Sequence, residues 1–441
     1  MLADDTIAAI STPPGEGAIA VIRVSGPDAI RVAERIFRPR KAGAVLSERV
    51  LHFGSFHRDS EKLDEGLLAV FAAPRSYTGE NMAEIHGHGG ALVSSRLYEA
   101  VLEAGARAAE PGEFTQRAFI NGKMDLTQAE AVMDVIRAST PRALKAAQEQ
   151  LRGRLGDEIE AIRARVLAVV AHLEAYIDFP EEGINPHVGA DLLRDIAAIQ
   201  ERITALLDTA EEGRILREGV RLVLCGAPNA GKSSLLNRLL GFERAIVSAI
   251  PGTTRDTIEE FASLHGLPFR ITDTAGLRET DDVIEREGVE RARRAIENAD
   301  VIVRVIDATE TYDLARTENE LIVLNKVDLL ASRDSLPAQA LPVSCTTGEG
   351  IRSLVDAIVA RTRGANIESP TLAAINARHQ SCLVRAQKAL AQATEDLAAG
   401  RDPELVALPL REALQAVGEV VGLADTEEIL GEIFSTFCIG K

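Results

Sequence analysis

The sequence predicts a multidomain protein with an α+β N-terminal domain, an α-helical central domain and an α/β P-loop domain inserted into the helical one. Three observations support this fold class. Short β-rich runs come first, apolar residues spaced three and four apart follow, and a glycine-rich phosphate-binding motif divides the helical pattern into two blocks. A chain of 441 residues is also long for one hydrophobic core, so about three domains are expected.

The N-terminal domain is predicted over residues 1–120. Its apolar runs at 18–24 and 66–71 alternate with glycine- and proline-rich turns and indicate strands. Two helical patterns lie near 27–37 and 90–104. This mixture of elements is typical of an α+β domain.

The helical domain begins with a change of period after residue 120. Between Leu151 and Ile177 apolar residues recur three and four apart, which predicts one long amphipathic helix that ends before Pro180. The same spacing predicts a second helix over 192–206. The first part of the helical domain is therefore assigned to residues 121–213.

Helical patterns return over 371–400 and 404–436. Pro409 lies inside the second pattern and should kink or break it, because proline lacks an N–H and its ring clashes with the preceding turn. Residues 366–441 would form the second part of the helical domain, with residues 214–365 inserted between the two parts. Composition alone also allows two separate bundles.

The inserted domain carries the pattern G-x-x-x-x-G-K-S at 226–233. An apolar run at 220–225 precedes it and a helical segment at 234–240 follows, which is the context that a P-loop requires. The glycines let backbone N–H groups turn toward a polyphosphate, Lys232 can reach the outer phosphates, and the Ser233 hydroxyl can ligate magnesium. The predicted contacts of this segment are Asn229, Ala230, Gly231, Lys232, Ser233 and Ser234.

An N-K-x-D motif after the short apolar run 321–324 predicts that the base is guanine. Guanine presents two donors on its N1/N2 edge, and the Asp328 carboxylate can accept both. Adenine lacks this pair and would leave Asp328 unpaired, which is costly. Asn325 can brace the loop or contact the ring, and backbone N–H groups of 344–348 can close over the base. The predicted contacts are Asn325, Lys326, Asp328, Ser344 and Cys345.

The connection before this motif is short. Only 17 residues (308 to 324) separate Asp307 from Asn325, and a strand uses several of them. The crossover helix at this point is therefore expected to be very short or absent.

Two further segments are predicted to sense the γ-phosphate. In D-T-A-G at 273–276, Asp273 can hold magnesium through water and the Gly276 N–H can meet the phosphate. The segment 250–256 offers two adjacent threonine hydroxyls, one of which can ligate magnesium; a solvated turn is the alternative interpretation. Loops that γ-phosphate and magnesium order, and hydrolysis releases, are the basis of GTPase switching. The predicted contacts are Thr253, Thr254, Asp273, Thr274, Ala275 and Gly276.

Composition argues against several other classes. A net charge of −18 argues against broad, tight, non-specific RNA binding, so a protein of this charge that acts on RNA would be expected to reach it with a partner's help. Four cysteines without paired spacing argue against a disulfide framework or a zinc site. The first residues lack the parts of a signal peptide and no apolar run approaches a membrane span, so we expect a reduced, cytoplasmic protein.

The order GAPNAGKSS, GTTRD, DTAGL and NKVD resembles the translation-factor-related GTPases, in the branch that contains the MnmE (TrmE) family of tRNA-modification GTPases and its Era-like relatives. The last five residues, FCIGK, match the C-terminal signature of the MnmE family. The segments YTGEN, HGHGG, PGEFTQRAF and NGKMDLTQAEA are similar to its N-terminal part. The resemblance covers nearly the whole chain and favours one helical domain over two bundles.

This resemblance implies a homodimer that hydrolyses GTP. With an FAD-dependent partner of the MnmG (GidA) type, such a protein adds a carboxymethylaminomethyl-type group at C5 of the wobble uridine of certain tRNAs. Two other functions stay open. One is an Era-like ribosome-assembly switch, which would usually add a basic RNA-binding domain. The other is a folate-dependent C1 transferase with a regulatory GTPase domain.

Hydrolysis needs a source of charge, because Leu277 stands where a Ras-type enzyme has a glutamine that orients water. The Asn229 carboxamide could hold a monovalent cation beside the β/γ bridge. Alternatively, Asn229 is only a turn residue that tolerates an unusual φ. The resemblance implies potassium ligands at Asn229, Ser248, Ile250 and Thr253, and magnesium ligands at Ser233 and Thr254. It also implies a general base at Glu285, which on sequence alone equally fits a solvated acidic helix start.

The resemblance implies that Cys438 takes part in the modification chemistry, although thiols near a chain end are usually buried or incidental. It also implies that the N-terminal domain binds 5-formyl- or methylene-tetrahydrofolate at a dimer interface through Arg23, Glu80, Lys123 and Lys441. Folate carboxylates need cations, and the donor edge of a pterin suits the Glu80 carboxylate. From the sequence alone these four residues would be interpreted as surface charges.

Overall fold

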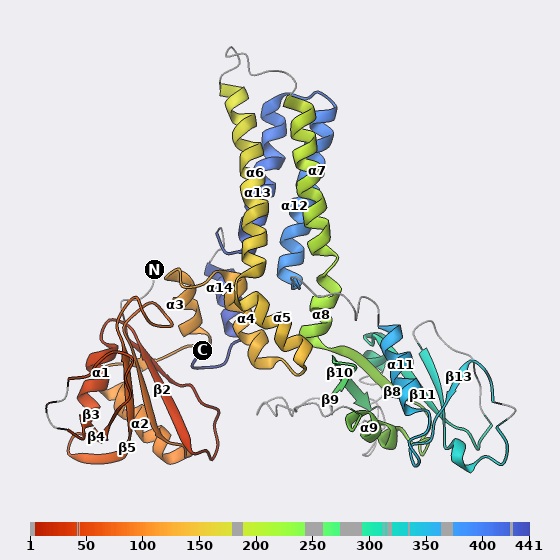
Figure 1. The fold of residues 1–441 in the computed structure, drawn as a ribbon, viewed down its shortest axis with the longest axis horizontal. Helices are drawn as coiled ribbons and strands as arrows, with labels where there is room; N and C mark the ends of the chain where they lie inside the picture. Colours follow the sequence, from red (N-terminus) through yellow and green to blue (C-terminus); the bar gives the residue numbers. More distant parts are fainter. Residues whose placement is uncertain are drawn as a thin grey trace. The chain divides into compact units, whose positions relative to one another are not determined.

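The computed structural model describes residues 5–41, 43, 45–178, 188–242, 259–273, 293–311, 314, 320–333, 336–362, 374–423 and 427–441 (Figure 1). The chain forms two compact units. Unit 1 comprises Met1–Met133 and Gly418–Lys441, and unit 2 comprises Asp134–Val417.

Unit 1 is built on a seven-stranded sheet with the strand order β3-β4-β5-β6-β2-β1-β7. All neighbouring strands are antiparallel except β1 and β7, which are parallel. The strands are β1 (Ile7–Ile10), β2 (Ile19–Ser25), β3 (Phe37–Pro39), β4 (His52–Arg58), β5 (Glu61–Phe71), β6 (Met82–His88) and β7 (Arg107–Ala108). Both strand runs and both helices predicted for this part of the chain are present.

The helices α1 (Ala29–Ile36) and α2 (Ala91–Glu103) supply the other half of the core of unit 1. Buried side chains of α1 and α2 pack with alternate residues of β2, since successive residues of a strand point to opposite faces. Val24 of β2, Val32 of α1 and Leu97 of α2 all lie in this one cluster. Burial of this one face favours a single register of the strands, because a shift by one residue would expose the apolar side chains.

The end of the chain belongs to unit 1. Unit 1 also contains three helices: α3 (Glu113–Ile120), most of α4 (Leu126–Arg137) and α14 (Glu427–Ser435). The residues of α4 after Met133 belong to unit 2. Phe434 and Phe437 pack against Leu126, Ala129 and Met133. The C-terminal tail is therefore held by an apolar cluster and not only by polar contacts.

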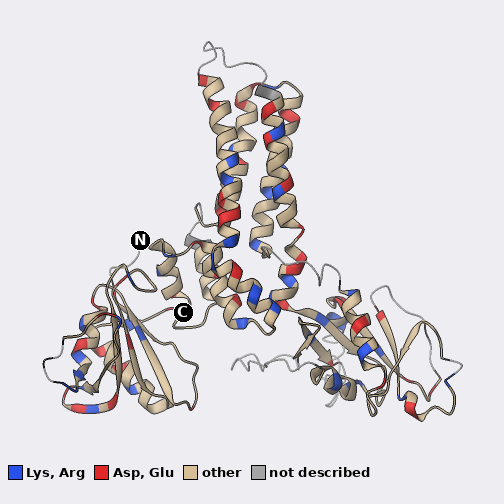
Figure 2. Ribbon diagram, viewed as in Figure 1, with Lys and Arg blue, Asp and Glu red and all other residues tan. Residues whose placement is uncertain are grey.

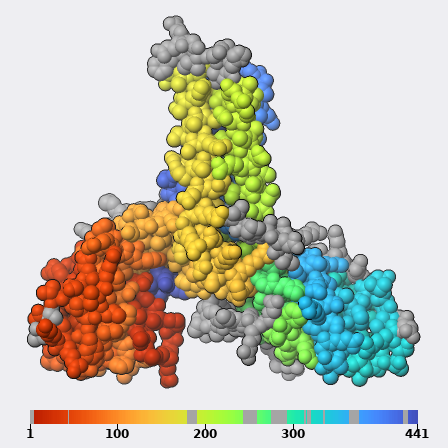
Figure 3. Space-filling view, viewed as in Figure 1, coloured from red at the N-terminus to blue at the C-terminus, as the bar shows by residue number. Residues whose placement is uncertain are grey.

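Four long helices, which belong to unit 2 except for the end of α13, lie side by side in Figure 1: α6 (Arg154–Asp178), α7 (Val188–Leu207), α12 (Ala377–Ala398) and α13 (Pro403–Val420). Figure 3 shows the atoms of α6 and α7 in contact. Arg411 of α13 bonds to Glu174 of α6, and Gln387 of α12 bonds to Thr204 of α7. Acidic and basic residues are interspersed along these helices (Figure 2).

The predicted start of the first long helix was wrong. Leu151 ends a separate helix, α5 (Pro141–Leu151), and α6 begins at Arg154. Gly153 lies between them with φ of +93°, a left-handed conformation that ends a helix. The apolar spacing continues across this break, so the period alone could not reveal it.

Pro409 was expected to kink or break the last helical block, and it does not break it: α13 runs from Pro403 to Val420 without interruption. Its buried face includes Val406, Leu410 and Ala413, each fully buried. Packing of this face stabilises the helix against the loss of one hydrogen bond.

A second sheet carries the P-loop domain. Its strand order is β13-β12-β11-β8-β10-β9, and all pairs are parallel except β9 and β10. The strands are β8 (Val220–Cys225), β9 (Glu259–Leu264), β10 (Leu267–Asp273), β11 (Val301–Asp307), β12 (Glu320–Asn325) and β13 (Ala340–Pro342). The helices include α8 (Ala210–Glu218), α9 (Lys232–Leu240), α11 (Ile351–Arg361) and the 3₁₀ turn η2 (Val327–Leu329).

The described residues between β11 and β12, 308–311 and 314, contain no helix. Among the helices that the structure describes, none is both long and apolar enough to cross a membrane. The α+β part, the helical part and the inserted α/β part together confirm the predicted fold class. The boundaries of the four predicted segments stay predictions.

Candidate functional site

The phosphate loop lies between β8 and α9, and its glycines are sterically required. Gly226 and Gly231 have φ of +139° and +96°. A Cβ atom on Gly226 would lie 2.1 Å from the Val305 carbonyl oxygen. On Gly231 it would lie 2.1 Å from Nδ2 of Asn325. At Gly226 a larger residue would force the backbone to shift, and at Gly231 it would displace the Asn325 amide and adopt a φ that favours glycine.

The two polar side chains that end the motif are already positioned. Lys232 is buried, and its Nζ donates to the carbonyls of Gly226 (3.0 Å) and Ala227 (2.9 Å). The Ser233 hydroxyl donates to Oδ2 of Asp273 at the end of β10, at 2.9 Å. The parallel pairing of β8 and β10 brings the two predicted magnesium-binding side chains together.

Asn325 connects the phosphate loop to the loop that contains Cys345. Its Nδ2 donates to the Ala230 carbonyl at 2.9 Å, and its Oδ1 accepts from the Cys345 N–H at 3.2 Å. This agrees with a bracing role. Asn325 is buried, so the connection is shielded from water.

The N-K-x-D loop holds a carboxylate oxygen that lacks a partner. Lys326 has φ of +67°, and its Nζ lies 2.6 Å from Oδ2 of Asp307. Burial alone would raise the pKa of Asp307, but the Lys326 ammonium and two bonds from Thr309 outweigh it and lower the pKa. Oδ1 of Asp328 is buried, and no residue in the described part of the chain donates a hydrogen bond to it. Such a group is costly unless a ligand supplies the donor.

The loop that was expected to close over the base is a compact turn. Ser344 is fully buried, and its hydroxyl accepts from the Thr347 N–H at 3.1 Å. Its carbonyl accepts from Gly348 N–H at 2.8 Å. Burial raises the pKa of the Cys345 thiol, which favours its neutral form, so this side chain adds no charge to the loop.

Several predicted residues lie outside the described part of the chain, and Leu277 is one of them. The others are Ser248, Ile250, Thr253, Thr254, Thr274, Ala275, Gly276 and Glu285. Asn229 and Ser234 are described and exposed. Asn229 has φ of +63°, which fits the turn interpretation.

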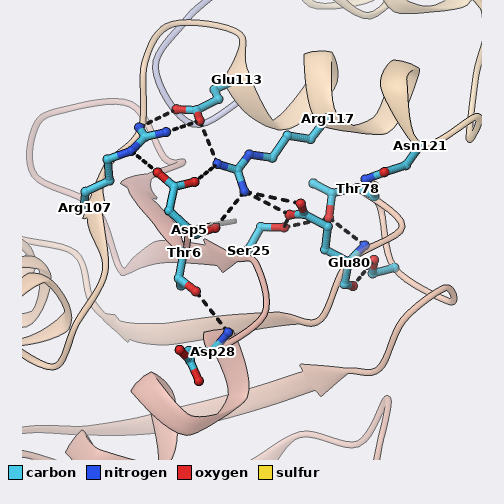
Figure 4. A network of polar contacts seen from close by, with 11 residues as sticks. Asp5, Thr6, Ser25, Asp28, Thr78, Glu80, Arg107, Glu113, Arg117 and Asn121 are labelled. Carbon is cyan, nitrogen blue, oxygen red and sulfur yellow. Dashed lines mark hydrogen bonds and ion pairs between the residues drawn. The ribbon is translucent and has the colours of Figure 1, made fainter. Parts of the chain in front are cut away.

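Unit 1 contains a buried network of charges that the sequence did not reveal (Figure 4). Arg117 is almost fully buried and lies between three carboxylates. Its Nη2 bonds to Asp5 at 2.7 Å and Glu113 at 2.9 Å, and its Nη1 bonds to both oxygens of Glu80 at 3.3 Å. The i, i+4 spacing of Glu113 and Arg117 was the only available signal.

The carboxylate of Glu80, one of the predicted folate contacts, therefore already accepts hydrogen bonds from Arg117. It also accepts a bond from the Ser25 hydroxyl at 2.7 Å. Another predicted contact, Lys123, donates to the Pro74 carbonyl at 3.1 Å. The structure does not place Lys123 in a bond with any of the other three predicted folate contacts, within the described residues.

Arg23 lies close enough to Lys441 for its charge to affect the pKa of that lysine. Arg23 forms an ion pair with Glu84 at 3.0 Å, and its guanidinium lies 5.3 Å from the centre of the Tyr77 ring. Burial, followed by the charge of Arg23, lowers the pKa of Lys441. The thiol of Cys438 is exposed on the same tail.

A mostly parallel sheet with a phosphate loop, a positioned serine–aspartate pair and a buried carboxylate oxygen in an N-K-x-D loop defines a P-loop protein of the guanine-nucleotide-binding class. Comparison with known proteins narrows this class. The model of the MnmE helical domain matches residues 126–438, and the model of the GTP-binding protein TrmE N-terminus matches residues 6–123. The chain belongs to the MnmE (TrmE) family of tRNA-modification GTPases.

Two relatives illustrate the similarity, and both are named tRNA modification GTPase MnmE. The protein from Akkermansia muciniphila is 48% identical, with 99% of each chain covered. The protein from Symbiobacterium thermophilum is 47% identical, with 100% of each chain covered. Among solved structures, the G domain of the T. maritima FeoB iron transporter is 24% identical with a TM-score of 0.25, and the match covers 33% of this chain and 99% of that domain.

Proposed function

We propose that this chain binds and hydrolyses GTP as part of tRNA modification. The observation that carries the proposal is the buried, unpaired Oδ1 of Asp328, in a loop that Asn325 ties to the phosphate loop. The donors on guanine N1 and N2 would satisfy this carboxylate, and adenine has no such pair. The relatives named tRNA modification GTPase support the biological role.

The residues near the phosphates would divide the work of hydrolysis. Lys232 would neutralise charge on the outer phosphates, and the loop N–H groups would bind them. Ser233 and Asp273 supply oxygen ligands of the kind that Mg²⁺ prefers, and they meet at 2.9 Å. When bound, Mg²⁺ supplies charge that offsets the negative charge developing on the phosphates.

We further propose a potassium requirement and a general base. Asn229 is the described member of the proposed potassium ligands, and its exposed carboxamide leaves an oxygen available. Glu285 is the proposed base, by resemblance to the family. A monovalent cation at Asn229 would supply the charge that Ras-type enzymes obtain from an arginine.

The modification itself would use the N-terminal unit. Arg23 and Lys441 are cations suited to folate carboxylates, and Cys438 is an exposed thiol on the tail that ends at Lys441. We propose that a homodimer binds 5-formyl- or methylene-tetrahydrofolate through Arg23, Glu80, Lys123 and Lys441. With an FAD-dependent MnmG-type partner it would modify C5 of the wobble uridine, and the cytoplasm is the expected site because its substrate is tRNA.

Nucleoside analysis of tRNA from a deletion strain tests the proposal. Loss of a C5-modified wobble uridine, restored by the wild-type gene, is the expected result. Unchanged nucleosides together with a ribosome-assembly defect would favour the Era-like switch. Unchanged wobble uridine with altered one-carbon pools would favour the C1 transferase.

A further inference from the structure

Arg238 connects α9, the helix that follows the phosphate loop, to residues 344–348. These residues are expected to close over the base and are called the base loop below. Arg238 lies in the last turn of α9, and its side chain is exposed. Its Nε donates to the Cys345 carbonyl at 2.6 Å, and its Nη2 donates to the Thr346 carbonyl at 2.7 Å. One guanidinium thus bonds to two successive carbonyls, in a planar fork that lysine cannot reproduce.

These bonds complete the support of the base loop. Within the loop, the Ser344 N–H donates to the Glu349 carbonyl at 2.9 Å and the Gly348 N–H to the Ser344 carbonyl at 2.8 Å. These contacts shape the turn but do not attach it to the rest of the domain. Cys345 is attached on two sides, because its N–H donates to Asn325 and its carbonyl accepts from Arg238.

We infer that Arg238 is a positioning residue for guanine recognition. Its guanidinium fixes the segment 345–346. The N–H groups of Cys345, Thr347 and Gly348 already donate within the domain, so the Thr346 N–H is the one that would bind O6 of the base. Because α9 begins at Lys232, the same helix presents Lys232 to the phosphates and fixes the base loop. The inference rests on the proposed binding of GTP.

The test measures dissociation of a fluorescent guanine nucleotide from the full-length chain. Arg238→Met should accelerate dissociation roughly tenfold, equivalent to about 1.4 kcal/mol. Arg238→Lys keeps the charge but not the fork and should fall between Met and wild type. Arg221→Met is the matched control: Arg221 is an exposed arginine at the opposite end of β8, paired with Glu218, and its loss should leave the rate unchanged.

A second measurement separates positioning from general destabilisation. Replacing guanine O6 with sulfur, in a 6-thioguanine nucleotide, weakens one acceptor and keeps the N1/N2 donors. If Arg238 acts through the loop, replacing oxygen with sulfur should reduce the nucleotide affinity of Arg238→Met by a smaller factor than it reduces the affinity of the wild type. Both changes weaken the same contact, the one between the loop and position 6 of the base. A merely structural role would leave the cost equal in both proteins.

Equal dissociation rates for wild type and both Arg238 variants would overturn the inference, and so would an unchanged cost of the sulfur substitution. Failure of the wild-type protein to bind guanine nucleotides would instead overturn the proposed function. If Arg238→Met does not fold, the lysine variant carries the same comparison, because it preserves charge and chain length.

Discussion

The substitution Asp328→Asn tests how the protein selects its base. In the structure Oδ1 of Asp328 is buried without a hydrogen-bond partner, while the neighbouring Lys326 is occupied by Asp307. The loop is therefore fixed by contacts that the substitution does not touch. The change removes a charge and turns one acceptor into a donor, in a side chain of nearly the same shape.

The size of the effect follows from the bonds that are lost. A hydrogen bond to a charged group contributes about 1.5–3 kcal/mol, and the carboxylate would accept two from guanine. Asparagine keeps one acceptor but points a donor at the second guanine donor. We expect GTP binding to weaken by about 3 kcal/mol, or roughly 100-fold. Xanthine has a carbonyl at C2, so the variant should favour xanthosine nucleotides.

Titration of the purified protein with GTP and with xanthosine triphosphate measures both affinities. Asp356→Asn is a matched control, because Asp356 of α11 is an exposed carboxylate that pairs with His265. The control should bind both nucleotides as the wild type does. Undiminished affinity of Asp328→Asn for GTP would refute the assignment, whatever its affinity for the xanthosine nucleotide.

Three other predictions concern separate parts of the chain. GTP turnover should depend on potassium far more than on sodium, and Asn229→Ala should abolish that dependence with nucleotide binding largely intact; full hydrolysis in sodium buffer would contradict this. Cys438→Ser should fold and hydrolyse GTP at the wild-type rate but fail to restore modified wobble uridine in a deletion strain, as nucleoside analysis would show. Arg117→Met should lower the free energy of unfolding by about 1–3 kcal/mol at neutral pH, because Glu80 loses its arginine while Asp5 and Glu113 keep Arg107. Burial alone would raise the pKa values of Asp5 and Glu113, but bonds to arginines outweigh it and lower both. Their stabilisation is therefore present above about pH 4 and is lost as the pH falls through the lowered values, so the gap between wild type and Arg117→Met should narrow in acid; a gap that is constant from pH 7 to pH 3 in denaturant titrations would contradict it.

The parts of the nucleotide site that were predictable are those that the backbone dictates. Gly226 and Gly231 are required by close approach to other atoms, and the N-K-x-D motif follows directly on a buried strand. Where the spacing of residues is set by a strand, a turn and a helix, the sequence contains the geometry. Asp328 could therefore be proposed as the guanine-binding carboxylate from its place after this strand, and its buried oxygen supports that proposal.

Contacts between distant residues could not be predicted in the same way. Arg117 and Asp5 are 112 positions apart, and Arg238 and Cys345 are 107 apart. An arginine in the sequence gives no sign of whether its partner is water, a carboxylate or a main-chain carbonyl. Burial distinguishes these cases, and burial follows from the packing of the whole unit.

The helical part shows both outcomes. The apolar residues of α7 predicted the helix correctly, since one face must be buried. The break at Gly153 went against the prediction, and of the predicted kink or break at Pro409 the break is absent. At Gly153 a single left-handed backbone angle ends the helix, and at Pro409 packing of the buried face outweighs the local preference of proline. The spacing of apolar residues contains no information on either effect.

The structure of the tail strengthens the test of Cys438. Phe437 is buried against α4 and the Ser11 hydroxyl bonds to the Gly440 carbonyl at 3.2 Å, so residues on both sides of Cys438 anchor the tail. Cys438 itself is exposed. Replacing its sulfur with oxygen therefore removes little packing, and a large loss of stability is not expected. A serine hydroxyl is far less nucleophilic than a thiolate at neutral pH. A variant that folds normally but leaves tRNA unmodified would consequently indicate a chemical role, whereas normal modification would leave Cys438 without one.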